Sequence, residues 1–150
     1  MHEFDTSISV AAPIDEVFDF LTRPENVIQV TAPDAGVSVV DAPEVMQPGS
    51  RNKLKFSGFG PTQTFIYEVT EFVRPERFVE VLIEGPMKMF RNEHEFESHG
   101  SDGTSVRDRI VFQPPGGLIG MVVNEKLIRS QLEKGFRFRH AQLQRLFGTA

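Results

Sequence analysis

The chain has 150 residues, of which 39% are hydrophobic and 25% are charged, and its formal net charge at pH 7 is −5. This length and composition fit one globular domain, so residues 1–150 are treated as a single unit. The acidic balance argues against a nucleic-acid partner, because proteins that bind the phosphate backbone carry a concentrated basic surface. The lack of cysteine excludes disulfides, thiolate zinc ligands and a cysteine nucleophile.

Targeting segments are not expected in this sequence. Residues 1–5 have neither the basic start nor the apolar run of a secretion signal. The longest aliphatic stretch, residues 118–123, is far too short to span a bilayer. We therefore expect a cytoplasmic protein without a membrane span.

The first 33 residues predict one strand followed by two short helices. Apolar and polar side chains alternate over residues 3–10, as a half-buried strand requires. Residues 14–21 have apolar side chains at helical spacing behind Pro13, which suits a helix start. Pro24 begins a second helix, and the step into Pro33 ends it because the residue before proline disfavours the helical region.

Residues 36–113 predict six strands separated by turn clusters. The spacing of the turns is short and regular, which favours neighbouring antiparallel strands over the long crossovers of a parallel sheet. With the first strand, they predict a seven-stranded antiparallel sheet. The turn clusters fall at residues 43–50, 58–61, 74–77, 85–86 and 99–103.

The pattern becomes helical after residues 114–117, and we expect one long helix from about residue 118 to 147 whose apolar stripe covers the sheet. Gly135 lies at the edge of this stripe, where close packing on a strand and a kink that enlarges a pocket explain it equally well. The stripe consists of Met121, Ile128, Leu132, Phe136, Leu143 and Leu146.

Three segments carry a family resemblance: residues 8–13 (ISVAAP) followed by Val17 and Phe18, residues 108–120 (DRIVFQPPGGLIG), and residues 136–139 (FRFR). With the order of elements, they resemble the START and birch-pollen-allergen-like superfamily, often called SRPBCC, and its polyketide cyclase/dehydrase-type branch. The resemblance implies an α+β helix-grip fold, in which a curved seven-stranded antiparallel sheet wraps around the long C-terminal helix. It also implies an internal cavity for a hydrophobic small molecule. Fold-level likeness supports a pocket more than a reaction.

The hairpin at residues 99–103 predicts a polar pair inside the protein. Alternation puts His94 on the apolar face of one strand and Asp108 on the apolar face of the next. A five-residue loop between the strands then sets His94 opposite Asp108. The other pairs predicted by this register are Phe90 with Phe112 and Phe96 with Val106.

Two interpretations of the pair stay open. Either His94 and Asp108 form a structural pair that holds the register, or His94 exchanges a proton with a ligand carbonyl while Asp108 fixes its tautomer. The sequence does not decide the direction in which the pKa of His94 shifts, because burial lowers it and an ionised Asp108 raises it. Arg139, in the stripe of the last helix, is the expected next polar neighbour. Its guanidinium is expected to reach Asp108, a backbone carbonyl or solvent, and a ligand carboxylate is the weaker alternative.

Tyr67 is the only tyrosine, and it offers a hydroxyl to a ligand if Phe65, Tyr67 and Val69 face inward. The pattern of residues 64–72 does not exclude the opposite choice, in which Ile66, Glu68, Thr70 and Phe72 face inward, so Tyr67 ranks below His94. The apolar loop at residues 45–48, together with Phe59, is explained by a cavity lid, a partner contact or ordinary loop packing.

Other chemical signatures do not hold. His94 and His99 are five residues apart on a strand and point to opposite faces, so no metal site is expected. The glycines at 116–120 lack the spacing of a phosphate loop, and the sequence contains no GxSxG elbow of a hydrolase. No cofactor is predicted.

The leading hypothesis is a non-catalytic binding protein for a hydrophobic or amphipathic small molecule, held between the sheet and the last helix. The alternative is a polyketide cyclase/dehydrase-type enzyme in which His94 or Tyr67 acts as acid or base. A second alternative is a protein-interaction module, including a homodimer. The predicted ligand-binding residues are Tyr67, Phe90, Asn92, His94, Phe96, Asp108, Phe112, Phe136 and Arg139.

Overall fold

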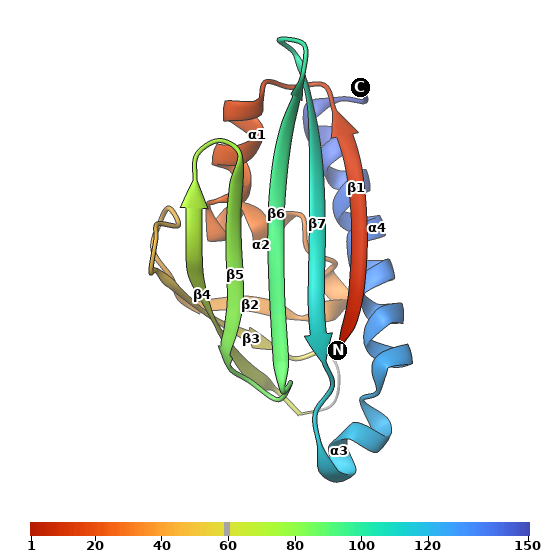
Figure 1. Cartoon of the computed structure of the whole chain (residues 1–150). Helices are drawn as coiled ribbons and strands as arrows, with labels where there is room; N and C mark the ends of the chain where they lie inside the picture. The colour runs from red at the N-terminus through yellow and green to blue at the C-terminus, as the bar shows by residue number, and fades with distance from the viewer. Residues whose placement is uncertain (59–60) are drawn as a thin grey trace.

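The computed structural model describes residues 1–58 and 61–150, and within them seven strands form one curved antiparallel sheet (Figure 1). The spatial order is β1-β7-β6-β5-β4-β3-β2, so β1 and β2 are the two edges and the chain crosses the sheet between them. The strands are β1 (His2–Val10), β2 (Val37–Asp41), β3 (Arg51–Phe56), β4 (Gln63–Val73), β5 (Arg77–Glu84), β6 (Met89–His99) and β7 (Gly103–Gln113).

The helices cover one side of this sheet, and the longest of them runs along β1 (Figure 1). The expected α+β helix-grip fold, with two short helices after the first strand, is confirmed. No helix among the described residues is both long enough and apolar enough to cross a membrane. The helices are α1 (Ile14–Leu21), α2 (Pro24–Gln29), the 3-10 helix η1 (Pro33–Ala35), α3 (Gly117–Val122) and α4 (Glu125–Phe147).

The expectation of one uninterrupted last helix is wrong, because the chain forms α3 and α4 there. Asn124 stands between them, and its side-chain oxygen accepts a hydrogen bond from the Leu127 amide at 2.9 Å, which starts α4 as a new helix. Met121 therefore belongs to α3 and is exposed, outside the buried stripe. Leu146, in the last turn of α4, is also exposed.

The β6–β7 hairpin has the predicted register. His94 pairs with Asp108, Phe90 with Phe112 and Phe96 with Val106. The turn itself contains Gly100 at a positive φ of 71°, a left-handed conformation that glycine adopts without a steric penalty. Because paired residues of an antiparallel ladder share a face, the register places all six side chains on the concave face toward the helices.

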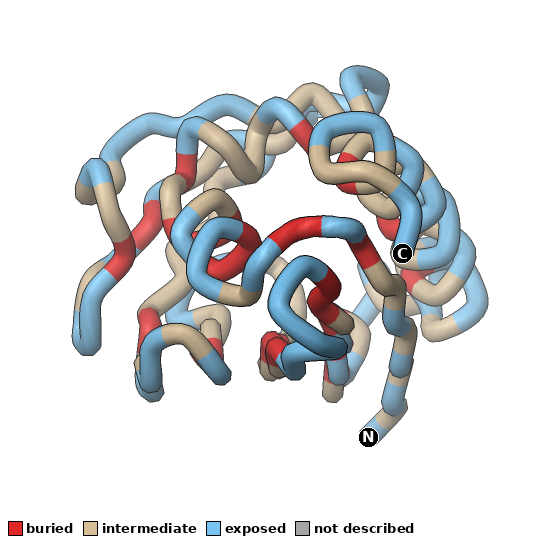
Figure 2. Tube along the Cα trace, turned by 90° about the horizontal axis from the view of Figure 1, so that it is seen from above, coloured by how far each residue is buried: buried red, intermediate tan, exposed pale blue. Residues whose placement is uncertain are grey.

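Two groups of buried side chains fill the space between sheet and helices, where the buried stretches of the chain gather (Figure 2). The upper core lies at the α1 end of the sheet and centres on Phe18, whose ring meets the edges or faces of Phe72, Phe78 and Phe96 at centroid distances of 5.3, 5.8 and 5.0 Å. The lower core holds α4 against β1 and β7 and contains Ile110, Phe112, Ile128 and Phe136.

The convex face of the sheet is charged. Arg77 and Arg91 each form ion pairs with Glu71 and Glu93, and Arg107 pairs with Asp5 of the edge strand. These pairs are partly or largely exposed, so each contributes little to stability. The convex face is therefore a solvated surface, and the chemistry of interest lies on the concave side.

Candidate functional site

A group of five polar side chains lies on the concave face of the sheet, and we call it the central polar cluster. Its members come from four strands: Asn52 from β3, Glu80 from β5, Asn92 and His94 from β6, and Asp108 from β7. The ladders align them, because Glu80 pairs with Asn92 and His94 pairs with Asp108. All except Glu80 are at least nine-tenths buried.

His94 is held from three sides. Its Nδ1 lies 2.6 Å from Asp108 Oδ1, and its Nε2 lies 3.0 Å from Glu80 Oε1. The imidazole also stacks on the ring of Phe78, with centroids 4.1 Å apart and planes 14° from parallel. A protonated imidazole is favoured by both carboxylates and by the aromatic face.

The charges of the cluster follow from this geometry. Burial lowers the pKa of His94, but the nearby Asp108 and Glu80 outweigh burial and raise that pKa to about 9. Burial raises the pKa of Asp108, but the charge and hydrogen bonding of His94, with smaller contributions from Arg139 and His140, hold it below its ordinary value. Near neutral pH His94 is therefore an imidazolium paired with the ionised Asp108, and its second ring nitrogen lies against Glu80.

Two amide oxygens of the cluster have no donor within the described chain. Asn52 donates through Nδ2 to Glu80 Oε2 at 3.4 Å, which leaves Asn52 Oδ1 as the free end of that amide. Asn92 Oδ1 is also buried and accepts no hydrogen bond from a described residue. A buried acceptor that lacks a donor costs about 1–3 kcal/mol, so these oxygens favour any group that supplies an N–H or O–H.

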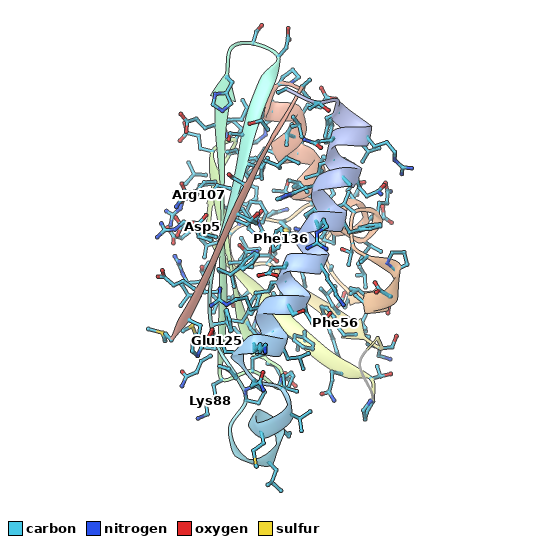
Figure 3. All side chains as sticks on the ribbon, turned by 90° about the vertical axis from the view of Figure 1, so that its right-hand side faces the viewer. Asp5, Phe56, Lys88, Arg107, Glu125 and Phe136 are labelled. Atoms are coloured by element: carbon cyan, nitrogen blue, oxygen red, sulfur yellow. The ribbon has the colours of Figure 1, made fainter. Side chains whose placement is uncertain are left out.

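A row of four aromatic rings, which we call the aromatic row, lies beside the cluster. Phe56 of β3 meets Phe65 of β4 at 4.4 Å, Phe65 meets Tyr67 at 6.2 Å, and Tyr67 meets Phe90 of β6 at 6.0 Å. All four side chains are only partly buried, and none belongs to the buried set of either core. Figure 3 shows Phe56 toward the α3 end of the molecule, beyond the part of α4 that carries Phe136.

The inward face of β4, which the sequence left open, contains Phe65, Tyr67 and Val69, and beyond the register shift between Val69 and Glu71 it continues with Phe72, which packs on Phe18. Val69 is fully buried in the upper core, and Tyr67 pairs with Asn52 of the cluster. Burial, and then the negative charge of Glu80, raise the pKa of Tyr67 above its ordinary value, so the phenol stays protonated. Among the described residues, the Tyr67 hydroxyl forms no hydrogen bond.

The aromatic side chains that were predicted to bind the ligand fall into two groups, those of the aromatic row and those of the two cores. Tyr67 and Phe90 belong to the aromatic row, whereas Phe96 lies in the upper core and Phe112 in the lower core. Phe136 is also part of the lower core and stacks on Phe4 at 5.8 Å. Phe4 and Phe136 both line a shallow groove of about 320 Å³ between β1 and α4.

The sequence predicted Arg139 as the next polar neighbour of His94 and Asp108, and this prediction is wrong. Glu80 lies against the second ring nitrogen of His94 instead. The Arg139 guanidinium lies over the ring of Phe136, 5.4 Å from its centroid. It acts on Asp108 through its charge alone.

Within the loop at residues 45–48, Met46 packs inward: its side chain is buried in the upper core and its amide donates to the Thr22 carbonyl at 2.7 Å, whereas residues 47 and 48 are exposed. Phe59, the other residue of that prediction, lies outside the described residues. Within residues 1–58 and 61–150, no set of three histidine or acidic side chains is arranged to hold a metal ion.

The curved sheet, the long helix that it grips and the polar cluster on its concave face together define a helix-grip protein. The sequence model of the family described as polyketide cyclase / dehydrase and lipid transport matches residues 1–148. The chain belongs to this family, which supports the binding of hydrophobic ligands in general. No curated protein matches the sequence.

Solved structures share the fold at low sequence identity. A START superfamily protein from Mycobacterium smegmatis is 17% identical, with a TM-score of 0.72 over 97% of this chain and 99% of its own. A protein from Chromobacterium violaceum is 12% identical, with a TM-score of 0.74 over 96% and 99%. Ginseng major latex-like protein 151 from Panax ginseng is 15% identical, with a TM-score of 0.65 over 95% and 97%.

Proposed function

We propose that the protein binds a small molecule that has an apolar, ring-sized body and at least one hydrogen-bond donor, on the concave face beside the central polar cluster. The aromatic row carries this proposal, because all four of its rings stay partly exposed. The rings that centre the two cores are buried instead, namely Phe18, Phe78, Phe96, Phe112 and Phe136. Ligand sites are concave and mostly apolar, with a few placed polar groups. Membership of a family described by lipid transport supports the same class of ligand.

The polar end of the ligand is assigned from the acceptors of the cluster. Neither Asn52 Oδ1 nor Asn92 Oδ1 has a donor among the described residues, and the ionised Asp108 only accepts hydrogen bonds. A hydroxyl or amine on the ligand satisfies such oxygens, whereas a carboxylate brings a further negative charge beside Glu80 and Asp108. We therefore propose a neutral or cationic ligand that donates hydrogen bonds.

The geometry of His94 favours binding without catalysis. A general base needs a ring nitrogen that is free to take a proton, and both nitrogens of His94 already lie against carboxylates. Since its pKa is raised to about 9, the ring is protonated near neutral pH and its protons are directed at Glu80 and Asp108. Under this proposal His94 fixes the positions of the two acidic side chains.

A fluorescence titration with the neutral probe N-phenyl-1-naphthylamine tests the aromatic row. The wild-type protein should bind the probe saturably, and Phe65→Ser should weaken binding at least fivefold. Val73→Ser is the matched control, because Val73 lies on the same strand but is about half exposed and outside the row. Absence of wild-type binding, or equal affinities for wild type and Phe65→Ser, contradicts the proposed site.

A matched pair of ligands tests the polar end. 2-Naphthol carries a hydroxyl donor and 2-methoxynaphthalene does not, while their ring bodies are the same. The wild type should bind 2-naphthol roughly tenfold more tightly, as one hydrogen bond to a buried acceptor implies. Asn92→Leu should remove that preference and retain the binding of 2-methoxynaphthalene. Equal wild-type affinities for the two ligands contradict the proposed role of the acceptors.

A further inference from the structure

The segment from Pro114 to Val123, which contains α3, exposes more apolar surface than the fold requires, and we call it the α3 tip. Its ten residues include no charged or hydrogen-bonding side chain. Four large side chains of α3 are exposed: Leu118 (83%), Ile119 (58%), Met121 (75%) and Val122 (72%). Contiguous exposed apolar surface marks an interaction site, whereas apolar residues that are exposed singly do not.

The exposed side chains spread around the helix. At about 100° per residue, Leu118, Ile119, Met121 and Val122 cover an arc of roughly 160°. Most of the remaining circumference is occupied by Gly117 and Gly120, which have no side chain to present. A protein partner covers one face of a helix and meets a polar rim around that face. A helix that is apolar over so wide an arc suits instead an apolar phase that surrounds it, such as the interior of a lipid leaflet.

The tip is held firmly in place by the rest of the fold. Val123 packs against the lower core, and its amide donates to the Ile119 carbonyl at 2.8 Å. Asn124 then caps α4 directly behind it. In Figure 1 α3 stands beyond the ends of β6 and β7, at the opposite end of the molecule from α1. The apolar side chains are therefore presented on a projection.

Basic side chains flank the tip. Lys88 lies against Gly116, since a Cβ built on that glycine would be 2.8 Å from Lys88 Cε, and Figure 3 shows Lys88 beside α3. Lys126 follows the tip at the start of α4. Neither lysine forms an ion pair within the described chain, whereas the nearby Glu125 is paired with Arg129 and His2. The local charge is thus positive on a protein whose net charge is −5.

We propose that the α3 tip docks on the surface of an anionic lipid bilayer. Leu118, Ile119, Met121 and Val122 enter the boundary between headgroups and acyl chains, and Lys88 and Lys126 contact lipid phosphates. Exposed apolar area and adjacent basic charge are the two contributions that bind interfacial helices to anionic membranes. This surface is separate from the concave site, so the proposal stands whether or not a ligand binds there.

Vesicle flotation of the full-length protein tests the proposal, with vesicles of phosphatidylcholine and phosphatidylglycerol in equal amounts. The wild type should float with them, bind pure phosphatidylcholine at least fivefold more weakly, and lose affinity as salt rises. The double variant Leu118→Glu/Met121→Glu should bind at least tenfold more weakly. Lys88→Gln/Lys126→Gln should bind several-fold more weakly and depend less on salt. Val73→Glu, at the opposite end of the sheet, should match the wild type.

An insertion assay separates docking on lipid from association between proteins. The chain has no tryptophan, so Leu118→Trp introduces a single reporter at the tip. Its emission should shift to the blue with anionic vesicles and be quenched by brominated acyl chains, while Val73→Trp should show neither effect. Failure of the wild type to bind vesicles overturns the proposal. Concentration-dependent dimerisation that Leu118→Glu abolishes, without any vesicle binding, assigns the tip to a second copy and also overturns it.

Discussion

The two ends of the concave face use the same residue type in different ways. At the α1 end, Phe18, Phe78 and Phe96 pack against one another and are almost completely buried. At the α3 end, the four side chains of the aromatic row touch in a line but stay partly exposed. The central polar cluster lies on the same face, and its members on β6, Asn92 and His94, stand between Phe90 of the aromatic row and Phe96 of the upper core. Under the proposed function, the α1 end of the grip provides stability and the other end provides surface for a ligand.

Truncation of one phenylalanine in each region should give the largest difference in stability between the two ends. Phe18→Ala removes a fully buried ring that meets three others, and it should lower the free energy of unfolding by about 3–5 kcal/mol. Phe65→Ala should cost less than about 2 kcal/mol, because its ring is already partly exposed. Urea denaturation measures both. Equal losses would place Phe65 in the core and remove the distinction between the two ends.

The pH dependence of stability tests the cluster between the two regions. The pKa of His94 is raised from 6.5 to about 9 in the folded protein, so its stabilising contribution is complete below pH 6.5 and is lost as the pH rises through about 9. The free energy of unfolding should fall across this window by on the order of 3 kcal/mol. The lowered pKa of Asp108 acts at the acid end, where its contribution is lost as the pH falls through that lowered value.

Variants assign the alkaline part of this curve. His94→Gln should be less stable than the wild type near pH 6 and should flatten the decline between pH 6.5 and 9. His99→Gln, in the exposed hairpin, should leave the curve unchanged. Urea denaturation at a series of pH values gives the comparison. A decline that persists in His94→Gln would mean that the buried imidazolium is not its source.

Gly135→Ala should give the smallest effect in urea denaturation, and it tests whether the fold requires a glycine at this position of α4. A Cβ at this position would meet no heavy atom within 4 Å, so close packing on a strand does not explain the glycine. The substitution should raise the free energy of unfolding by about 0.5–1 kcal/mol, because alanine loses less conformational freedom in a helix. A loss of stability would show that the position is constrained in a way the structure does not reveal.

Periodicity and hairpin register predict much of the fold and one pair of the site. The alternation in β6 and β7 is unambiguous, since apolar side chains fill one face, and it correctly sets His94 opposite Asp108. The direction of the pKa shift of His94 depends on a second carboxylate, Glu80, which this register does not involve. The correct register of β6 and β7 therefore predicted one of the two acidic side chains beside His94, Asp108, and missed the other, Glu80.

Glu80 is hard to find from sequence because both faces of β5 are apolar. Val79 and Val81 make a better predicted inner face than Phe78 and Glu80, yet the structure turns Phe78 and Glu80 inward to meet His94. Bulges between β4 and β5 shift the register and further weaken alternation as a guide. Asn52 and Phe56 come from β3, which pairs with the part of β4 that contains Phe65 and Tyr67. Their place in the site follows from the register of this pair of strands.

The boundary between α3 and α4 shows a different limit of prediction from sequence. Asn124 is a good helix cap, but helical periodicity continues on both sides of it, so the stripe joined Met121 to the residues of α4. The capping bond to the Leu127 amide separates the two helices and leaves the α3 tip exposed. A local capping signal thus decided which apolar residues reach the core.

The most direct test of the proposed ligand surface uses the single tyrosine and the methionine methyl groups as NMR reporters. Tyr67 lies in the aromatic row, Met87 packs against the lower core as Phe90 does, and Met46 is buried in the upper core. On titration of the labelled protein with 2-naphthol, the Tyr67 and Met87 resonances should shift saturably with one Kd, and Met46 should not move. Shifts of Met46 without shifts of Tyr67 would place the ligand at the wrong end of the grip and contradict the account.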